Sequence, residues 1–198
     1  TYRGRAAEAA AVVEQIESAG GSAVALHLDV TDIASFPAFV DTLTATLADT
    51  WQVDRLTALV NNAGIGGGAP FETVTEEQFD AFHRTLFKGP YFLTQRLLPL
   101  LADGASIVNT GSTSALPTGV QPYYSPYAAQ KGAVHALTYC WAKELAPRRI
   151  RVNAVAPGST RTRIAGDAFA SLPPEALADV AAHVGLGRIA EPEDIAGA

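Results

Sequence analysis

Residues 56–64 read Leu-Thr-Ala-Leu-Val-Asn-Asn-Ala-Gly, a short apolar run that ends in two amides and a glycine. A short apolar run bounded by turn residues is typical of a buried strand. We therefore predict a strand over residues 56–60 that ends at a polar loop, Asn61–Gly64.

The chain continues this alternation of apolar runs and helical periodicity on both sides of that segment. Further strands are expected over residues 23–28, 105–109 and 150–155, and helices over residues 5–19, 33–50, 75–101 and 127–146. Alternating strands and helices require parallel strands with right-handed crossovers. The pattern predicts an α/β fold, a doubly wound parallel sheet with helices on both faces, and such sheets bind ligands at the carboxyl ends of their strands.

Length and composition restrict the class of protein. The 198 residues are 48% hydrophobic, which suits one domain over residues 1–198. The net charge is −6 without a basic cluster, which argues against nucleic acid and against an anionic membrane surface as partners. There is no secretory signal and no apolar run of about 18 residues, so we expect a soluble, cytoplasmic protein. The single cysteine, Cys140, excludes an intrachain disulfide and a cysteine-based metal site, and we expect it to be buried.

Tyr127-Ala-Ala-Gln-Lys131 places a phenol and an ammonium one turn apart on a helix. Ser125 followed by Pro126 resembles an N-cap and a first helical residue, so Tyr127 is expected in the first turn. Both the helix dipole and Lys131 would then favour the phenolate and lower the pKa of Tyr127. Such a pair can perform acid/base chemistry, but alone it is a common pattern on helices.

Polar loops follow three of the expected strands. They are Asn61–Gly64, residues 111–114 (Gly-Ser-Thr-Ser) and residues 157–162 (Pro-Gly-Ser-Thr-Arg-Thr). Because the strands are parallel, these loops should face one crevice. The Gly66–Gly68 run is interpreted as a turn and not as a phosphate loop, since neither a lysine nor a helix start follows it.

Together these motifs resemble the short-chain dehydrogenase/reductase family in their order and approximate spacing. The resemblance rests on Asp29-Val30, Asn61–Gly64, Ser112, Tyr127 with Lys131, and Pro157-Gly158. It covers nearly the whole chain and is closest to the single-domain reductases that act on small carbonyl or alcohol groups. It implies an NAD(P)-binding Rossmann fold.

The resemblance implies three catalytic residues. Tyr127 would be the general acid/base, and Lys131 would lower its pKa and bind the nicotinamide ribose. Ser112 would donate a hydrogen bond to the substrate oxygen. Ser114 is the alternative serine, because three glycine or proline residues leave the path of the following loop open.

The resemblance also implies a set of cofactor contacts. Asp29 would accept a hydrogen bond from the adenine amino group and Val30 would pack on the ring, whereas Asp32 is the better helix cap. Tyr127 and Lys131 would contact the nicotinamide ribose. The remaining expected contacts come from two loops: Asn61, Asn62, Ala63 and Gly64, and Pro157, Gly158, Thr160 and Thr162.

Cofactor choice is expected to depend on the first residues of the chain. An acidic residue after the second strand favours NAD, and an arginine there accommodates the 2′-phosphate of NADP. Arg3 and Arg5 stand at this place and the first carboxylate is Glu8. We therefore predict NADP over NAD, with Arg3 as the contact.

The sequence departs from the family pattern in two respects. The glycine-rich turn that holds the cofactor pyrophosphate does not occur in it, nor does the last strand, so the fold is expected to be incomplete at both ends. In addition, Leu86 stands where the family carries an asparagine that holds a water in the proton relay to the lysine. Leucine cannot do this, which leaves His83 and Arg84, one turn away, as possible substitutes.

The sequence thus predicts an oxidoreductase that moves a hydride between NADP(H) and a carbonyl or secondary alcohol. The alternative is a non-catalytic cofactor-binding or scaffold protein of the same fold. The resemblance further implies a homodimer or homotetramer in which the helix around residues 133–145 forms an interface.

Overall fold

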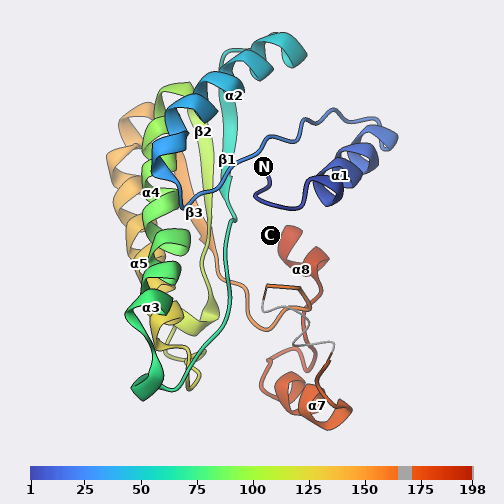
Figure 1. The fold of residues 1–198 in the computed structure, drawn as a ribbon, viewed down its shortest axis with the longest axis vertical. Helices are drawn as coiled ribbons and strands as arrows, with labels where there is room; N and C mark the ends of the chain where they lie inside the picture. Colours follow the sequence, from blue (N-terminus) through green and yellow to red (C-terminus); the bar gives the residue numbers. More distant parts are fainter. Residues whose placement is uncertain (165–170, 198) are drawn as a thin grey trace.

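The structure, a computed structural model, describes residues 1–164 and 171–197. Its centre is a parallel sheet of three strands in the order β1-β2-β3 (Figure 1). These strands are β1 (Leu56–Asn61), β2 (Leu101–Thr110) and β3 (Arg151–Val155). Asn61 aligns with Asn109 and Asn109 with Ala154, so the polar strand ends lie at one edge.

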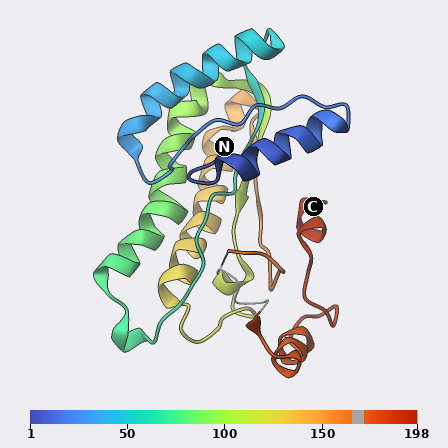
Figure 2. The same ribbon diagram turned by 45° about the vertical axis from the view of Figure 1, so that its right-hand side comes forward.

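Helices lie on both sides of the sheet, as predicted, but those on the side of α1 stand away from the strands (Figures 1 and 2). On one side lie α2 (Phe36–Trp51), α3 (Glu76–His83), α4 (Gly89–Leu97) and α5 (Ser125–Glu144). On the other lie α1 (Ala6–Ser18), α7 (Pro174–Ala182) and α8 (Pro192–Ala196). Short turns η1 (Ile33–Ser35), η2 (Phe71–Thr73), η4 (Leu98–Leu100), η5 (Thr113–Ala115) and η6 (Ala146–Arg148) connect them.

The helix expected over residues 75–101 is divided into shorter pieces. A capping box at Thr75 and Gln78 starts α3, because each residue's side chain bonds to the other's backbone. A π-helical turn, η3 (Arg84–Lys88), then separates α3 from α4, and β2 already begins at Leu101. The π turn contains Leu86, the residue singled out in the sequence.

Residues 23–28 do not form the expected sheet strand. Their ladder is limited to one parallel bridge between Tyr2 and His27, with Tyr2 N–H donating to the Leu26 carbonyl. A strand needs hydrogen bonds to a neighbour along its length, and Tyr2 alone provides them here. The segment nevertheless contributes Leu28 to a core cluster with Phe36 and three other buried residues.

Two helices expose side chains that could have been buried. Cys140 is exposed, so the prediction of a buried cysteine is wrong. The inner face of α5 is formed by Val134, Thr138 and Trp141, and Cys140 falls outside that stripe. Within the described residues, the apolar side of α1 is also uncovered, since Val12 remains half exposed.

Candidate active site

The three loops at the strand ends do converge. Gly111 N–H donates a 2.7 Å hydrogen bond to the Val155 carbonyl, and Thr113 N–H donates a 3.0 Å bond to the Pro157 carbonyl. Thr110 Oγ1 donates to Asn62 Oδ1 at 3.1 Å, which joins the ends of β1 and β2. One crevice therefore receives residues from all three strands.

A buried amide network fixes this edge of the sheet from below. Asn61 Nδ2 donates to Asn109 Oδ1 at 2.9 Å and to Thr94 Oγ1 at 3.0 Å. Asn109 Nδ2 in turn donates to Thr138 Oγ1 at 2.9 Å. The network ties β1 and β2 to α4 and α5, so the strand ends and both helices hold a common position.

Tyr127 lies in the first turn of α5, as predicted, although the cap differs from the prediction. The helix begins at Ser125 itself, and Tyr124 is the N-cap residue because its carbonyl accepts the first hydrogen bond, from Ala128 N–H. Ser125 therefore does not cap the helix. Pro126 still occupies the first turn, where its missing N–H costs nothing.

The pKa of Tyr127 is raised above its usual value near 10, contrary to the expectation that it is lowered. Burial is the largest cause, since Tyr127 is only 9% exposed. Its ring packs edge-on against Phe82 and Tyr124 and contacts the apolar side chain of Leu86. A hydrogen bond with the Ser112 side chain acts in the opposite direction and lowers the pKa.

Lys131 is buried one turn after Tyr127, with Nζ 5.9 Å from the centre of the tyrosine ring. Its Nζ donates a 2.6 Å hydrogen bond to the Thr110 carbonyl. Burial lowers the pKa of Lys131 to about 8, because the charged ammonium loses its hydration. The residue is thus close to its point of titration at neutral pH.

The side chain of Ser112 is the serine hydroxyl that acts on the pKa of Tyr127. Ser112 Oγ also accepts a 3.1 Å hydrogen bond from Ser114 N–H, which starts the turn η5. Ser112 is buried, as Lys131 is. Ser112, Tyr127 and Lys131 therefore form one cluster at the carboxyl end of β2.

Leu86 fills the space beside this cluster. It is 2% exposed and packs with Phe82 and Tyr127. His83 bonds through Nδ1 to Gln130 Oε1 at 3.1 Å, and Arg84 forms an ion pair with Asp80. The proposed substitutes for the missing asparagine are thus engaged elsewhere.

A cavity of about 10 Å³ remains between the π turn and Lys131. Its lining includes Leu86, Asn61 and Asn109. That volume corresponds to roughly one water molecule, and the two amides make its wall partly polar.

A larger pocket of about 580 Å³ opens between the start of α1 and the end of β1, and Ala63 lines both this pocket and the small cavity at Lys131. Its size is in the range of cofactor sites. Several of the expected cofactor contacts line it together: Arg3, Asp29, Val30, Ala63 and Gly64. The volume of the pocket and the polarity of its lining residues thus fit an adenine nucleotide.

Asp29 and the first arginines have acidic or polar partners in this pocket. Asp29 Oδ1 accepts hydrogen bonds from Thr31 N–H and Oγ1, at 2.8 and 2.7 Å. These bonds and the charge of Arg3 bring the pKa of Asp29 below its ordinary value, although burial, the largest single influence, acts to raise it. Arg5 pairs with Glu8 at 3.3 Å, and Glu8 also binds Arg163 at 3.0 Å.

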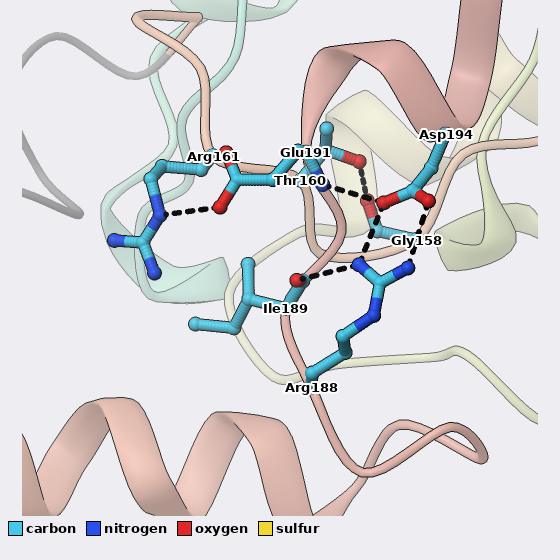
Figure 3. Close-up of polar contacts among 7 residues, drawn as sticks. All are labelled: Gly158, Thr160, Arg161, Arg188, Ile189, Glu191 and Asp194. Atoms are coloured by element: carbon cyan, nitrogen blue, oxygen red, sulfur yellow. Dashed lines mark hydrogen bonds and ion pairs between the residues drawn. The ribbon is translucent and has the colours of Figure 1, made fainter.

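The loop after β3 is held by a second set of contacts (Figure 3). Thr160 and Ala190 form a parallel bridge, and Arg161 Nε pairs with Glu191 at 3.1 Å. Arg188 donates to Asp194 through its two terminal guanidinium nitrogens, at 2.6 and 2.7 Å. We call this set the loop clamp; it fixes the residues that follow Gly158 against the start of α8.

Thr160 and Thr162 bond within their own loop. Thr160 Oγ1 donates to the Gly158 carbonyl at 3.1 Å, and Thr162 Oγ1 accepts from Ile164 N–H at 3.4 Å. Gly158 lies against Thr113, which brings this loop next to the loop of Ser112.

Asp32, at the N-cap of η1, lacks the expected side-chain cap within the described contacts.

Sequence reasoning did not identify the residues that support the site. The sequence places Asn109 within an expected strand and Thr138 within an expected helix, and it assigns no role to Arg188 or Asp194. His135, whose Nε2 accepts the Ser112 N–H at 3.4 Å, was also missed. Its spacing of four from Lys131 is the signal that could have placed it on the same helix face.

Comparison with known proteins relates the chain to reductases and other oxidoreductases. A family model described as enoyl-(acyl carrier protein) reductase matches residues 1–198. An uncharacterised oxidoreductase of Methylorubrum extorquens is 37% identical over 199 residues, which cover 99% of this chain and 75% of that protein. The 3-oxoacyl-[acyl-carrier-protein] reductase of Thermotoga maritima is 34% identical over 187 residues, 93% of this chain and 71% of that protein.

Solved structures agree with these relatives. The angucycline C-6 ketoreductase LanV with bound NADP matches with a TM-score of 0.90 at 32% identity, over 99% of this chain and 74% of that one. A short-chain dehydrogenase of Burkholderia cenocepacia in complex with NADP matches with a TM-score of 0.85 at 30% identity, over 99% of this chain and 75% of that one. This chain spans about three quarters of these proteins, and it belongs to the short-chain dehydrogenase/reductase family of NAD(P)-dependent oxidoreductases.

Proposed function

We propose that the protein interconverts a small carbonyl compound and its secondary alcohol with NADP(H), using Tyr127 as the general acid/base. The observation that carries the proposal is the cluster of Ser112, Tyr127 and Lys131, which is linked through Ala63 to a nucleotide-sized pocket. LanV and the Burkholderia dehydrogenase were solved with NADP, which supports the cofactor. The cofactor, when bound, supplies or accepts the hydride at its nicotinamide.

Ser112 and Tyr127 would share the substrate oxygen. In reduction, Tyr127 gives its phenolic proton to the carbonyl oxygen as the hydride reaches the carbonyl carbon, which yields the alcohol. Ser112 donates a hydrogen bond to the same oxygen as negative charge develops there. The raised pKa of Tyr127 keeps its proton in place before the reaction, which suits an acid in the reductive direction.

Lys131 would stabilise the phenolate that remains after the proton has left. Its Nζ lies 5.9 Å from the ring and is held by the Thr110 carbonyl. A cation at this distance favours the anionic form of the phenol. The same ammonium would bind the ribose of the cofactor, and Arg3 would bind the 2′-phosphate through its guanidinium group.

The test is NADPH oxidation against a panel of carbonyl compounds, followed at the absorbance of the reduced nicotinamide. Tyr127→Phe should abolish turnover while NADPH binding remains. Tyr139→Phe is the matched control, since Tyr139 lies on the same helix but is 71% exposed. NADPH binding without oxidation in the unmodified protein would contradict the proposal and favour a cofactor-binding scaffold.

A further inference from the structure

His135 lies on the same face of α5 as the two candidate catalytic residues, at positions 127, 131 and 135. Its ring reaches the point where β2 ends. A β-carbon on Gly111 would lie 2.1 Å from His135 Nε2, so the imidazole occupies the space that the missing side chain leaves. Only glycine at position 111 permits this contact.

Three successive N–H groups at the end of β2 have three different partners. Gly111 and Thr113 donate to the carbonyls of Val155 and Pro157, on the β3 side. The Ser112 N–H between them donates to His135 Nε2 at 3.4 Å. Ser112 is buried, so its N–H needs a partner within the protein, and the imidazole is the one that the described contacts provide.

This hydrogen bond defines the protonation state of the ring. An Nε2 that accepts a hydrogen bond carries no proton, so His135 is neutral with its proton on Nδ1. Burial is the main cause that lowers the pKa of His135, and the charge of Lys131 adds to it. Among the described residues Lys131 is the charged group that acts on the ring; Gly111, Ser112 and the Val155 carbonyl are uncharged.

We propose that His135 is a positioning residue, whose neutral imidazole holds the Ser112 backbone so that the serine side chain faces Tyr127. Protonation would turn Nε2 into a donor that faces the Ser112 N–H, and the serine would lose this support. Activity should therefore fall on the acid side as the ring becomes charged. The effect on turnover rests on the proposed function, whereas the contact with Ser112 does not.

The titration of the Ser112 amide tests the contact directly. In the ¹⁵N-labelled protein, the Ser112 amide shift should follow the His135 ring between about pH 5 and 8, the range in which histidines titrate, with a midpoint below the ordinary value. In His135→Gln this titration should disappear, because glutamine offers an uncharged acceptor of similar reach. The control is His183→Gln, at an exposed histidine that follows α7 and bonds to the Asp179 carbonyl; it should leave the titration unchanged.

The pH profile of kcat tests the consequence. His135→Gln should retain turnover and lose the acid limb. His135→Leu, which removes the acceptor, should lower kcat at all pH values by on the order of tenfold or more, since a displacement of about 1 Å near the reacting groups can cost about 10²-fold. The proposal would be overturned if the Ser112 amide shift did not follow the His135 titration, or if the shift still changed with pH in the same way in His135→Gln. Loss of turnover in every variant and in the unmodified protein would overturn only the proposed function.

Discussion

Lys131 Nζ donates its 2.6 Å hydrogen bond to the backbone carbonyl of Thr110 while lying 5.9 Å from the ring of Tyr127. The ammonium is thus fixed by the strand and not by the phenol. A buried lysine with one carbonyl partner is poorly compensated for the hydration it has lost. This explains why its pKa falls to about 8 and leads to a prediction about stability.

Lys131→Met should stabilise the protein near neutral pH while it abolishes turnover. The folded pKa is about 8 against 10.5 for the free side chain, so the unfolded chain binds more protons between these values and stability rises with pH there. The shift corresponds to about 3 kcal/mol at ~1.4 kcal/mol per pH unit, an upper limit because Thr110 loses its donor. Urea unfolding at pH 7 and 10 measures it; an advantage of the variant that does not shrink between these pH values would contradict the prediction.

Leu86→Asn should raise kcat and lower stability. The amide would face the cavity of about 10 Å³ beside Lys131 and could hold a water there, which restores the relay of the family. It would also bury a polar group among Phe82 and Tyr127, at a cost of about 1–3 kcal/mol. Leu86→Met, which conserves the volume, is the control. Unchanged or lower kcat at saturating substrate would show that the leucine does not limit proton transfer.

Arg3→Ala should weaken NADPH more than NADH. A charge-assisted hydrogen bond to the 2′-phosphate contributes roughly 1.5–3 kcal/mol, or about 10- to 100-fold in KM, and NADH lacks that phosphate. Arg5→Ala is the comparison, because Arg5 is already paired with Glu8. The ratio of the two KM values decides: an equal change for both cofactors would remove Arg3 from the phosphate site.

Asp194→Asn should release the loop clamp. Asp194 accepts hydrogen bonds from the two terminal guanidinium nitrogens of Arg188, and this hydrogen bonding holds the pKa of the carboxyl well below its usual range. Any stability the pair contributes is therefore present above the unfolded pKa near 3.8 and is lost only as the pH falls through the lower folded value. Amide exchange at Arg161 and Ala190 should accelerate in the variant at pH 7.

The control for the clamp is Asp80→Asn, which removes an exposed ion pair with Arg84 inside the π-turn region. Exchange at Arg161 should then remain as in the unmodified protein. If both variants accelerate it equally, the clamp has no local role.

The arrangement of the fold was predictable because strands and helices alternate with distinct periodicities. The apolar run before Asn61 and the polar loop after it lie where the pattern predicts. Local propensity could not predict the π turn at Leu86, because an extra residue in a helical turn depends on how α3 and α4 pack against α5. The exposure of Cys140 was missed for a similar reason: the inner face of a nearly apolar helix is decided by its neighbours.

The placement of the candidate site residues was predictable by residue type and order, but their electrostatics were not. Spacing brings Lys131 next to Tyr127, and the two do lie on one face. Whether the pKa of the phenol rises or falls depends on burial by Phe82 and Leu86, which come from a different helix and a π turn. The partner of the Ser112 N–H likewise depends on a contact between strand and helix that no local pattern contains.

The alternating partners of Gly111, Ser112 and Thr113 determine which distant substitutions can affect turnover. The N–H of Ser112 donates to a residue of α5, whereas the N–H groups of Gly111 and Thr113 donate to carbonyls on the β3 side. A substitution that rotates the helix by a few degrees, or one that shifts β3 along its axis, would therefore change the position of Ser112 first. In random mutagenesis, substitutions that lie far from the site and alter turnover should therefore occur in α5 and β3 far more often than in β1.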